Sequence, residues 1–189
     1  MMVPPSYRKL KRGPQVILPK DIGIIIAYTG IGKRSLCVDA GTGSGWLAVS
    51  LGRVAGKVVS YDIRDDFLKI AQRNIEIEQL DNVELKNGDV TKKIEEKEAD
   101  LVTLDFANSD KALRNARKAL KLGGHVVGYL PHMEQVKKFV STLEKLKFSN
   151  IYTIEIIVRD MLVRKEGMRP STKGVWHTGY LVFGQKQGE

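Results

Sequence analysis

The residues best suited to chemistry lie in a glycine-rich stretch, VDAGTGSGWL, from Val38 to Leu47. Apolar residues run into an acidic residue, and Gly41, Gly43 and Gly45 then alternate with hydroxyl residues before a second apolar run. This pattern predicts a strand, a tight turn and the start of a helix, because glycine tolerates positive φ and lets a ligand approach the backbone. The unpaired amides of that helix would face whatever the turn holds. A strand–helix turn without a ligand is the alternative interpretation.

A carboxylate follows at the spacing that nucleotide-binding folds use to hold a ribose. The segment Lys57 to Tyr61 is typical of a second strand, and Asp62 ends it. Asp62 stands about 20 residues after the first glycine of the turn, where such folds place the acid that accepts hydrogen bonds from the ribose hydroxyls. The flanking strand and this acid make the glycine motif more specific than glycines alone.

Two further strands are followed by or end on acidic residues. Asp89 follows Gly88 after the short strand Val83 to Lys86, and Asp105 closes the strand that begins at Asp100. Ligands of α/β sheets bind outside the carboxyl ends of the strands, so we expect these acids to converge with the glycine turn. The alternatives are a turn residue for Asp89 and a helix cap or surface acid for Asp105.

Strands and helices alternate along the chain, with short connections between them. This order predicts an α/β fold, a doubly wound, mostly parallel seven-stranded sheet with helices on both faces. We expect Gly123 and Gly124 to end a helix. Strands are expected at 35–39, 57–62, 83–86, 100–105, 125–130, 151–158 and 180–184, and helices at 21–28, 44–54, 64–79, about 113–120 and 136–143.

Composition indicates an ordinary globular protein of one domain, since 42% of the 189 residues are hydrophobic and 28% are charged. No apolar run is long enough to cross a membrane, and the first residues lack the apolar region of a secretory signal. The single cysteine, Cys37, lies in the first strand and is expected to be buried. These features predict a cytoplasmic location. The segment KKIEEKE after Thr91 is expected to be a solvated surface.

The net charge of +9 admits two interpretations. A basic protein is suited to a polyanionic partner such as nucleic acid, but it can also have no such partner. Residues 1–12 concentrate this charge in Arg8, Lys9, Lys11 and Arg12. This N-terminal arm is either a solvated tail or a segment that contacts phosphates.

The glycine turn, the acid after the second strand and the Gly-Asp pair after the third resemble class I S-adenosylmethionine-dependent methyltransferases, which have a Rossmann-like fold. Four stretches narrow the resemblance to the archaeal form of the tRNA (adenine-N1)-methyltransferases that act on adenine 58 of the T loop. They are RGPQVILPKD from Arg12, VDAGTGSGWL, VVSYDIRDDF from Val58, and MRPSTKGVWHTGYLVF from Met168. The resemblance covers nearly the whole chain from Arg12 onward, and the first and last stretches are the specific ones.

The resemblance implies S-adenosylmethionine as the cofactor and assigns residues to it. Asp62 would take the ribose hydroxyls with Phe67 nearby, and Asp89 would accept a hydrogen bond from the adenine amine. The turn and the start of the next helix would lie along the methionine and ribose. The full cofactor set implied is Gly41, Gly43, Ser44, Gly45, Trp46, Leu47, Asp62, Phe67, Gly88, Asp89 and Asp105.

Asp105 is the catalytic residue that the resemblance implies, and elementary chemistry agrees. Methyl transfer from a sulfonium is an in-line displacement, so the protein mainly supplies positioning. An adenine methylated at N1 becomes cationic, and a carboxylate that accepts from its exocyclic amine would aim the base and offset the charge. Gln15, Arg169 and His177 are substrate-side candidates, although His177 is also suited to capping the last strand. No metal site is expected.

The family carries a separate N-terminal β domain, whereas only about a dozen residues precede the matching region here. We therefore expect an arm at residues 1–12 and a methyltransferase catalytic domain at residues 13–189. The family resemblance also implies a homo-oligomer and a tRNA partner. In the loop after Asp105, FANSD stands where the family has a proline-containing Leu-Pro-x-Pro stretch.

Two other functions remain open at the level of sequence. One is methyl transfer to another acceptor, and the protein L-isoaspartate methyltransferases also place a Gln before the first helix, as Gln15 is here. The other is a non-catalytic partner subunit that keeps the fold without the chemistry. The basic charge favours RNA over the first alternative, and the retained acids Asp62, Asp89 and Asp105 argue against the second.

Overall fold

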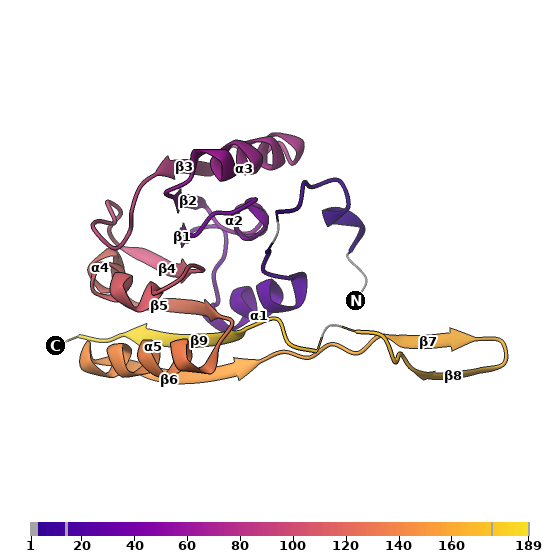
Figure 1. Ribbon diagram of the computed structural model, residues 1–189. Coiled ribbons are helices and arrows are strands. Elements are labelled where there is room, and N and C mark those ends of the chain that lie inside the picture. The colour runs from indigo at the N-terminus through magenta and orange to yellow at the C-terminus, as the bar shows by residue number, and fades with distance from the viewer. Residues whose placement is uncertain (1–3, 14, 175, 189) are drawn as a thin grey trace.

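A sheet of seven strands organises the computed structural model, which describes residues 4–13, 15–174 and 176–188. The strands of this sheet are β1 (Leu36–Ala40), β2 (Lys57–Asp62), β3 (Val83–Asn87), β4 (Ala99–Leu104), β5 (Leu120–Leu130), β6 (Phe148–Glu155) and β9 (Tyr180–Lys186). Their order is β3-β2-β1-β4-β5-β9-β6, and β9 is antiparallel to both of its neighbours (Figure 1). The predicted mostly parallel sheet is therefore confirmed.

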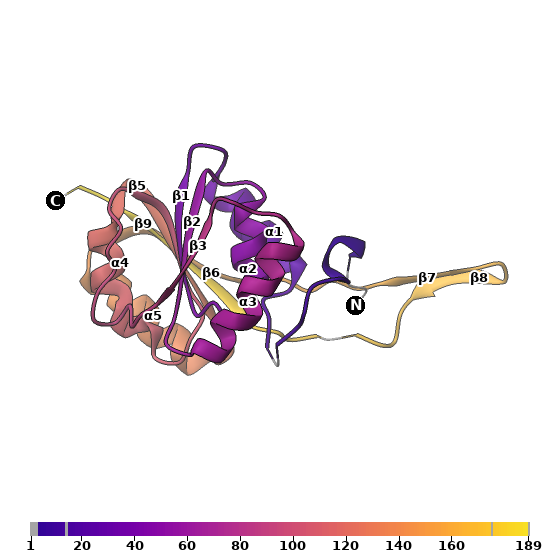
Figure 2. The same ribbon diagram turned by 90° about the horizontal axis from the view of Figure 1, so that it is seen from above.

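Helices cover both faces of the sheet, as predicted. The helices are α1 (Pro19–Thr29), α2 (Trp46–Gly52), α3 (Asp65–Ile77), α4 (Leu113–Ala119) and α5 (Met133–Lys145). The first three lie on one face and the last two on the other (Figure 2). Each covered face buries its own cluster of apolar side chains, with Ile22, Ile25 and Leu51 in one and Phe139 and Leu143 in the other. The sheet is thus doubly wound.

The central strands are buried on both faces, which explains their continuous apolar character. Val38 in β1 and Val102 in β4 are fully buried, as is Cys37, whose burial was predicted. Because these two strands end side by side in parallel, their carboxyl ends bring Ala40 and Leu104 into register. The segments that follow, the glycine turn and Asp105, are positioned by this pairing.

Gly123 and Gly124 lie inside β5, so the prediction that they end a helix is wrong. Helix α4 ends earlier, at Ala119, and β5 begins at the next residue. The pairing of β5 with β4 shifts register after Ala99, and Gly123 takes a φ of +77° there. A Cβ at Gly124 would lie 2.8 Å from the carbonyl oxygen of Ala99. The two glycines therefore accommodate an irregular strand start.

A two-stranded hairpin between β6 and β9 was not predicted. Its strands are β7 (Met161–Arg164) and β8 (Gly167–Pro170), and it projects away from the sheet (Figures 1 and 2). Strand β6 ends at Glu155, before the predicted end at residue 158. The absence of a helix between the last two sheet strands was predicted and is confirmed within the described residues.

Two segments are partly packed, the N-terminal arm, for which a solvated tail was one of two interpretations, and KKIEEKE, which was expected to be solvated. In the N-terminal arm, Tyr7 of the short 3-10 helix η1 (Pro5–Tyr7) and the nearby Leu10 are buried. The Tyr7 hydroxyl lies 2.6 Å from the Ser50 hydroxyl on α2, so a freely solvated tail is wrong for this part. In KKIEEKE, Ile94 is buried and Glu96 accepts a hydrogen bond from the Tyr61 hydroxyl.

Gly41→Ala should destabilise the fold strongly. A Cβ there would lie 2.1 Å from the carbonyl oxygen of Asp105, at a φ of +89° that disfavours side chains. Steric overlap of this kind and the left-handed backbone together cost at least about 2 kcal/mol of unfolding free energy. Gly23→Ala is the control, because Gly23 lies in α1 with nothing within 4 Å of the added carbon. Thermal unfolding that ranks the two variants equally would contradict this prediction.

Candidate functional site

The glycine turn after β1 has the geometry that the sequence predicted. Gly41, Gly43 and Gly45 have φ of +89°, +52° and +78°. The amides of Gly41 and Thr42 donate to the carbonyl oxygen of Tyr61 at 2.9 and 3.2 Å, which ties the turn to β2. A Cβ at Gly45 would lie 2.9 Å from Cβ of Ala71, so this glycine permits close packing against α3.

Asp62 ends β2 beside the glycine turn, where the sequence placed it. Its carboxylate accepts hydrogen bonds from the amides of Gly43 and Arg64, both at 3.0 Å and each on a different oxygen. Each carboxylate oxygen has two lone-pair sites, so both remain able to accept one more hydrogen bond. This arrangement suits a ligand with two vicinal hydroxyls.

A second carboxyl, Asp39, is buried beneath the turn. It accepts hydrogen bonds from the hydroxyls of Ser60 at 2.6 Å and Thr103 at 2.7 Å. Burial raises the pKa of Asp39, while these two hydroxyls act in the opposite direction. The hydroxyl donors from β2 and β4 thus tie the central strands together at the base of the site.

Asp105 follows β4 directly and lies against the turn. Its amide donates to the carbonyl oxygen of Ala40 at 2.8 Å, which fixes the backbone beside β1. Its carboxyl group has no hydrogen-bond partner within the described part of the chain. Burial first, and then the negative charges of Asp39 and Asp62, raise the pKa of Asp105 to about 7. A partly buried, unpaired carboxyl with this pKa is typical of a functional site.

A hollow of about 560 Å³ opens at the carboxyl ends of β2 and β3. Asp89 lines it, with one carboxylate oxygen accepting from the amide and hydroxyl of Thr91 at 2.9 and 2.6 Å. These hydrogen bonds lower the pKa of Asp89, so it stays ionised. Ile63, which the sequence analysis missed, is 69% exposed and gives the hollow an apolar surface. The remaining lining residues are Tyr61, Lys86, Asn87, Gly88, Lys92, Lys93 and Glu95.

Not every predicted cofactor residue presents its side chain at the turn. Trp46 and Leu47 are only 3% and 5% exposed, and the Trp46 indole donates to the carbonyl oxygen of Lys11 at 3.0 Å. The indole therefore packs beneath the N-terminal arm. Phe67 lies on the first turn of α3, with the Arg64 guanidinium 3.9 Å above its ring.

The three substrate-side candidates lie apart from one another. Gln15 is exposed in the segment before α1. Arg169 is exposed on the hairpin that projects from the sheet (Figure 1). His177 lies 2.6 Å from Glu155 and 2.9 Å from the carbonyl oxygen of Pro131. These contacts raise the pKa of His177 and agree with its role as a cap near the last strand.

A buried polar network near Asp105 was missed by the sequence analysis. The Lys20 ammonium contacts both carboxylate oxygens of the fully buried Asp21, at 2.7 and 2.9 Å, and the Thr178 hydroxyl at 2.8 Å. The Tyr129 hydroxyl donates to the Thr178 carbonyl oxygen at 2.7 Å. Burial first, and then the negative charges of Asp21 and Asp105, raise the pKa of Tyr129 to about 12. The only sequence signal was the Lys-Asp pair at a helix start.

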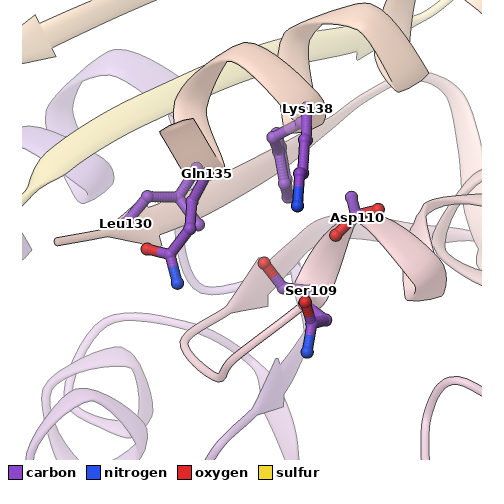
Figure 3. Close-up of a pocket in the computed structure, with 7 residues that line it drawn as sticks. Ser109, Asp110, Leu130, Gln135 and Lys138 are labelled. Carbon is purple, nitrogen blue, oxygen red and sulfur yellow. The ribbon is translucent and has the colours of Figure 1, made fainter. Parts of the chain in front are cut away.

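A smaller hollow lies under the loop that follows Asp105 (Figure 3). Its volume of about 20 Å³ has room for roughly one water molecule, so it is too small for a base. Ser109 is 1% exposed, and its hydroxyl has no partner in the described chain. The hollow is lined by Asn108, Ser109, Asp110, Leu130, Gln135, Lys138 and Phe139.

Two kinds of feature are absent from the described residues. No helix there is long and apolar enough to span a bilayer. No group of three or more histidine, cysteine, aspartate or glutamate side chains there is arranged to hold a metal ion.

The strand order and the glycine turn flanked by Asp62 and Asp105 define the class I methyltransferase fold. The family model described as "tRNA methyltransferase complex GCD14 subunit" matches residues 7–172. The chain belongs to this family.

Similar proteins agree with this assignment. The chain is 42% identical over 205 residues to the tRNA (adenine(57)-N(1)/adenine(58)-N(1))-methyltransferase TrmI of Methanocaldococcus jannaschii, covering 93% of this chain and 73% of that protein. The crystal structure of tRNA (m1A58) methyltransferase TrmI from Aquifex aeolicus superposes with a TM-score of 0.90 at 33% identity, over 97% of this chain and 75% of that one. A SAM-dependent O-methyltransferase from Thermotoga maritima gives a TM-score of 0.89 at 30% identity, over 93% and 68% of the two chains.

The residues present fit S-adenosylmethionine, the cofactor of this class. Asp62 keeps acceptor capacity for a ribose, and the exposed Ile63 offers an apolar face for an adenine. The Ser44 hydroxyl is buried at the turn without a partner in the described residues. The crowded carboxyls Asp39, Asp62 and Asp105 also favour a cationic sulfonium over a neutral ligand.

Asp105→Asn should change stability in a pH-dependent way. The pKa of about 7 lies above the ordinary value near 4, so the folded chain holds a proton between those pH values that the unfolded chain has lost. Wild type therefore loses stability as pH rises toward 7, because the folded chain must give up this proton. Asn does not titrate, so the melting temperature of the variant minus that of wild type should increase from pH 4.5 to 7 and then level off.

Calorimetry between pH 4.5 and 8.5 measures this difference. Asp89→Asn is the control, because the lowered pKa of Asp89 puts its titration below that range. The difference between that variant and wild type should therefore be flat with pH. An equally flat difference for Asp105→Asn would contradict the raised pKa.

Proposed function

We propose that this protein transfers the methyl group of S-adenosylmethionine to N1 of an adenine in tRNA, at the adenine 58 position that the names of its TrmI relatives give. The observation that carries the proposal is the unpaired Asp105 carboxyl at the end of β4, beside the glycine turn. A base that enters between this carboxyl and the methyl donor would be held from both sides. The relatives named for this reaction support the acceptor.

The protein's contribution to this reaction is positioning and charge. The cofactor, when bound, supplies an activated methyl group on a sulfonium. Adenine N1 carries a free lone pair, so no general base is needed for attack. Asp105 accepts a hydrogen bond from the exocyclic amine, aims N1, and offsets the positive charge that develops on the ring. Ionised Asp105 is required for both effects, and the nearby sulfonium and adenine cation favour that ionised form.

We assign the two halves of the cofactor to two parts of the site. Asp62 takes the ribose hydroxyls, while Asp89 and Ile63 hold the adenine in the larger hollow. The amides from Ser44 to Leu47 and the glycines Gly41, Gly43 and Gly45 follow the methionine. In this arrangement Trp46 and Leu47 act through their backbone, since their side chains are buried elsewhere.

The second candidate function is methyl transfer to another acceptor. The name of the Thermotoga maritima structure, an O-methyltransferase, supports it. The loop Phe106 to Asp110 lacks the prolines that the family resemblance leads us to expect, which leaves the acceptor open. The net charge of +9 favours tRNA over a protein acceptor. A non-catalytic subunit is disfavoured because Asp62, Asp89 and Asp105 are all in place.

We also propose a homo-oligomer and a cytoplasmic location. The hairpin carries three highly exposed apolar residues, Met161, Val163 and Met168, at 57%, 73% and 74%. A lone two-stranded hairpin is marginal in water, so a second copy that covers these side chains would stabilise it. Arg164 and Arg169 on the same hairpin add to the basic surface available to RNA.

Asp105→Asn should reduce the rate of methyl transfer about a hundredfold or more while leaving cofactor affinity nearly unchanged. The amide keeps the shape of the side chain and loses the charge that the transition state needs. Single-turnover methylation of T-loop tRNA gives the rate, and calorimetry with S-adenosylhomocysteine gives the affinity. Equal rates for the two proteins would remove Asp105 from the mechanism. No methylation of tRNA by wild type would favour the second candidate.

Replacing Lys11 and Arg12 by Gln should weaken tRNA binding and flatten its salt dependence. Both side chains are exposed. For each phosphate contact that is lost, the negative slope of log binding constant against log salt concentration should become shallower by about 0.7–0.9. Removing the whole arm is a poorer test, because Tyr7 is part of the core. The control replaces Lys33 and Arg34, which are exposed just before the amino end of β1, whereas the glycine turn follows its carboxyl end. Equal salt slopes for both double variants, measured by filter binding, would exclude an RNA role for the arm.

A further inference from the structure

Asn74 is a fully buried polar side chain on α3 whose amide uses all its donors. Its oxygen accepts from the Lys11 amide at 2.8 Å, and its nitrogen donates to the Lys11 carbonyl oxygen at 2.8 Å. The same nitrogen donates to the Ser44 carbonyl oxygen at 2.7 Å. One side chain therefore holds both polar groups of a residue in the N-terminal arm and one carbonyl of the glycine turn.

The neighbouring contacts make this a junction of three segments. The Trp46 indole donates to the same Lys11 carbonyl oxygen at 3.0 Å. Beyond Lys11 the chain passes over the turn, where a Cβ at Gly13 would lie 3.4 Å from the Cβ and hydroxyl of Ser44. Gly13 thus lies beside Ser44, with space for about one added carbon between them.

From this geometry we infer that Asn74 is a positioning residue of the cofactor site. It fixes the arm as one wall of the site and fixes the Ser44 carbonyl at the turn, so the two move together. The inference deepens the proposed function and rests on it for the identity of the cofactor. Lys11 is the clamped residue and Arg12 follows it, so both basic side chains leave the chain at the same junction.

If Asn74 had only a structural role, replacing it would change the cofactor site no more than replacing another hydrogen-bonded asparagine. Asn82 is a matched comparison, because its side-chain nitrogen also donates twice to backbone carbonyls, of Gly52 at 2.8 Å and Ala55 at 2.9 Å. Those carbonyls lie at the far end of α2 from the turn. Asn82→Ala therefore removes similar hydrogen bonds without touching Lys11 or Ser44.

The test compares Asn74→Ala with Asn82→Ala by calorimetry with S-adenosylhomocysteine and by hydrogen exchange. We expect Asn74→Ala to weaken the affinity about tenfold and to speed exchange of the amides at residues 8–13, with Asn82→Ala within about twofold of wild type in both. Equal affinities and equal exchange for the two variants would overturn the inference.

Wild type provides a measurement that does not depend on either variant folding. S-adenosylhomocysteine should slow exchange at residues 8–13 as well as at residues 41–47 if arm and turn are coupled. Protection of the turn alone would overturn the inference. No binding at all by wild type would instead overturn the proposed cofactor, and faster exchange of the arm in Asn74→Ala would then still support the junction.

Discussion

The close approach of the glycine turn to the backbone of Asp105 is the constraint on which the site depends. Strands β1 and β4 are parallel neighbours, so the segments that leave them start side by side, and the Asp105 amide donates to the carbonyl oxygen of Ala40 at 2.8 Å. Only a residue without Cβ fits at Gly41, because an added carbon would lie 2.1 Å from the Asp105 carbonyl oxygen. That contact brings the Asp105 carboxyl next to Asp39 and Asp62, and the resulting crowding raises its pKa to about 7. The steric restriction at Gly41 and the raised pKa of Asp105 therefore have the same structural cause.

The parallel core could be predicted from the sequence because its signals are local. Strands β1, β2 and β4 contain short apolar runs with a turn residue or an acid after them, and β3 alternates apolar and polar residues, so each is interpretable without tertiary information. The same locality explains why Asp62, Asp89 and Asp105 could be placed correctly at strand ends. Whether each contacts a cofactor is not decided by its place in the fold, so those roles stay predictions.

The errors arose where tertiary contacts override local preference. Gly123 and Gly124 resemble a helix stop, but the register shift of β5 against β4 uses them inside a strand. Trp46 was assigned by its place in a motif, whereas its side chain is buried under an arm that comes from 35 residues earlier. The Lys20–Asp21–Thr178 network also joins residues 157 positions apart, a separation that no window of sequence contains.

Under the proposed function, the carboxyls of the site would favour a positive charge first on the methyl donor and then on the methylated adenine. Three carboxyls with one shared low-dielectric environment disfavour full ionisation, so in the absence of a cation Asp105 near neutral pH is divided between its two protonation states. Under the proposed function, a sulfonium bound beside Asp105 would shift that balance toward the carboxylate. Methyl transfer would leave the cofactor neutral and the adenine cationic. Asp105 would then face a positive charge before and after the transfer, first on the cofactor and then on the base.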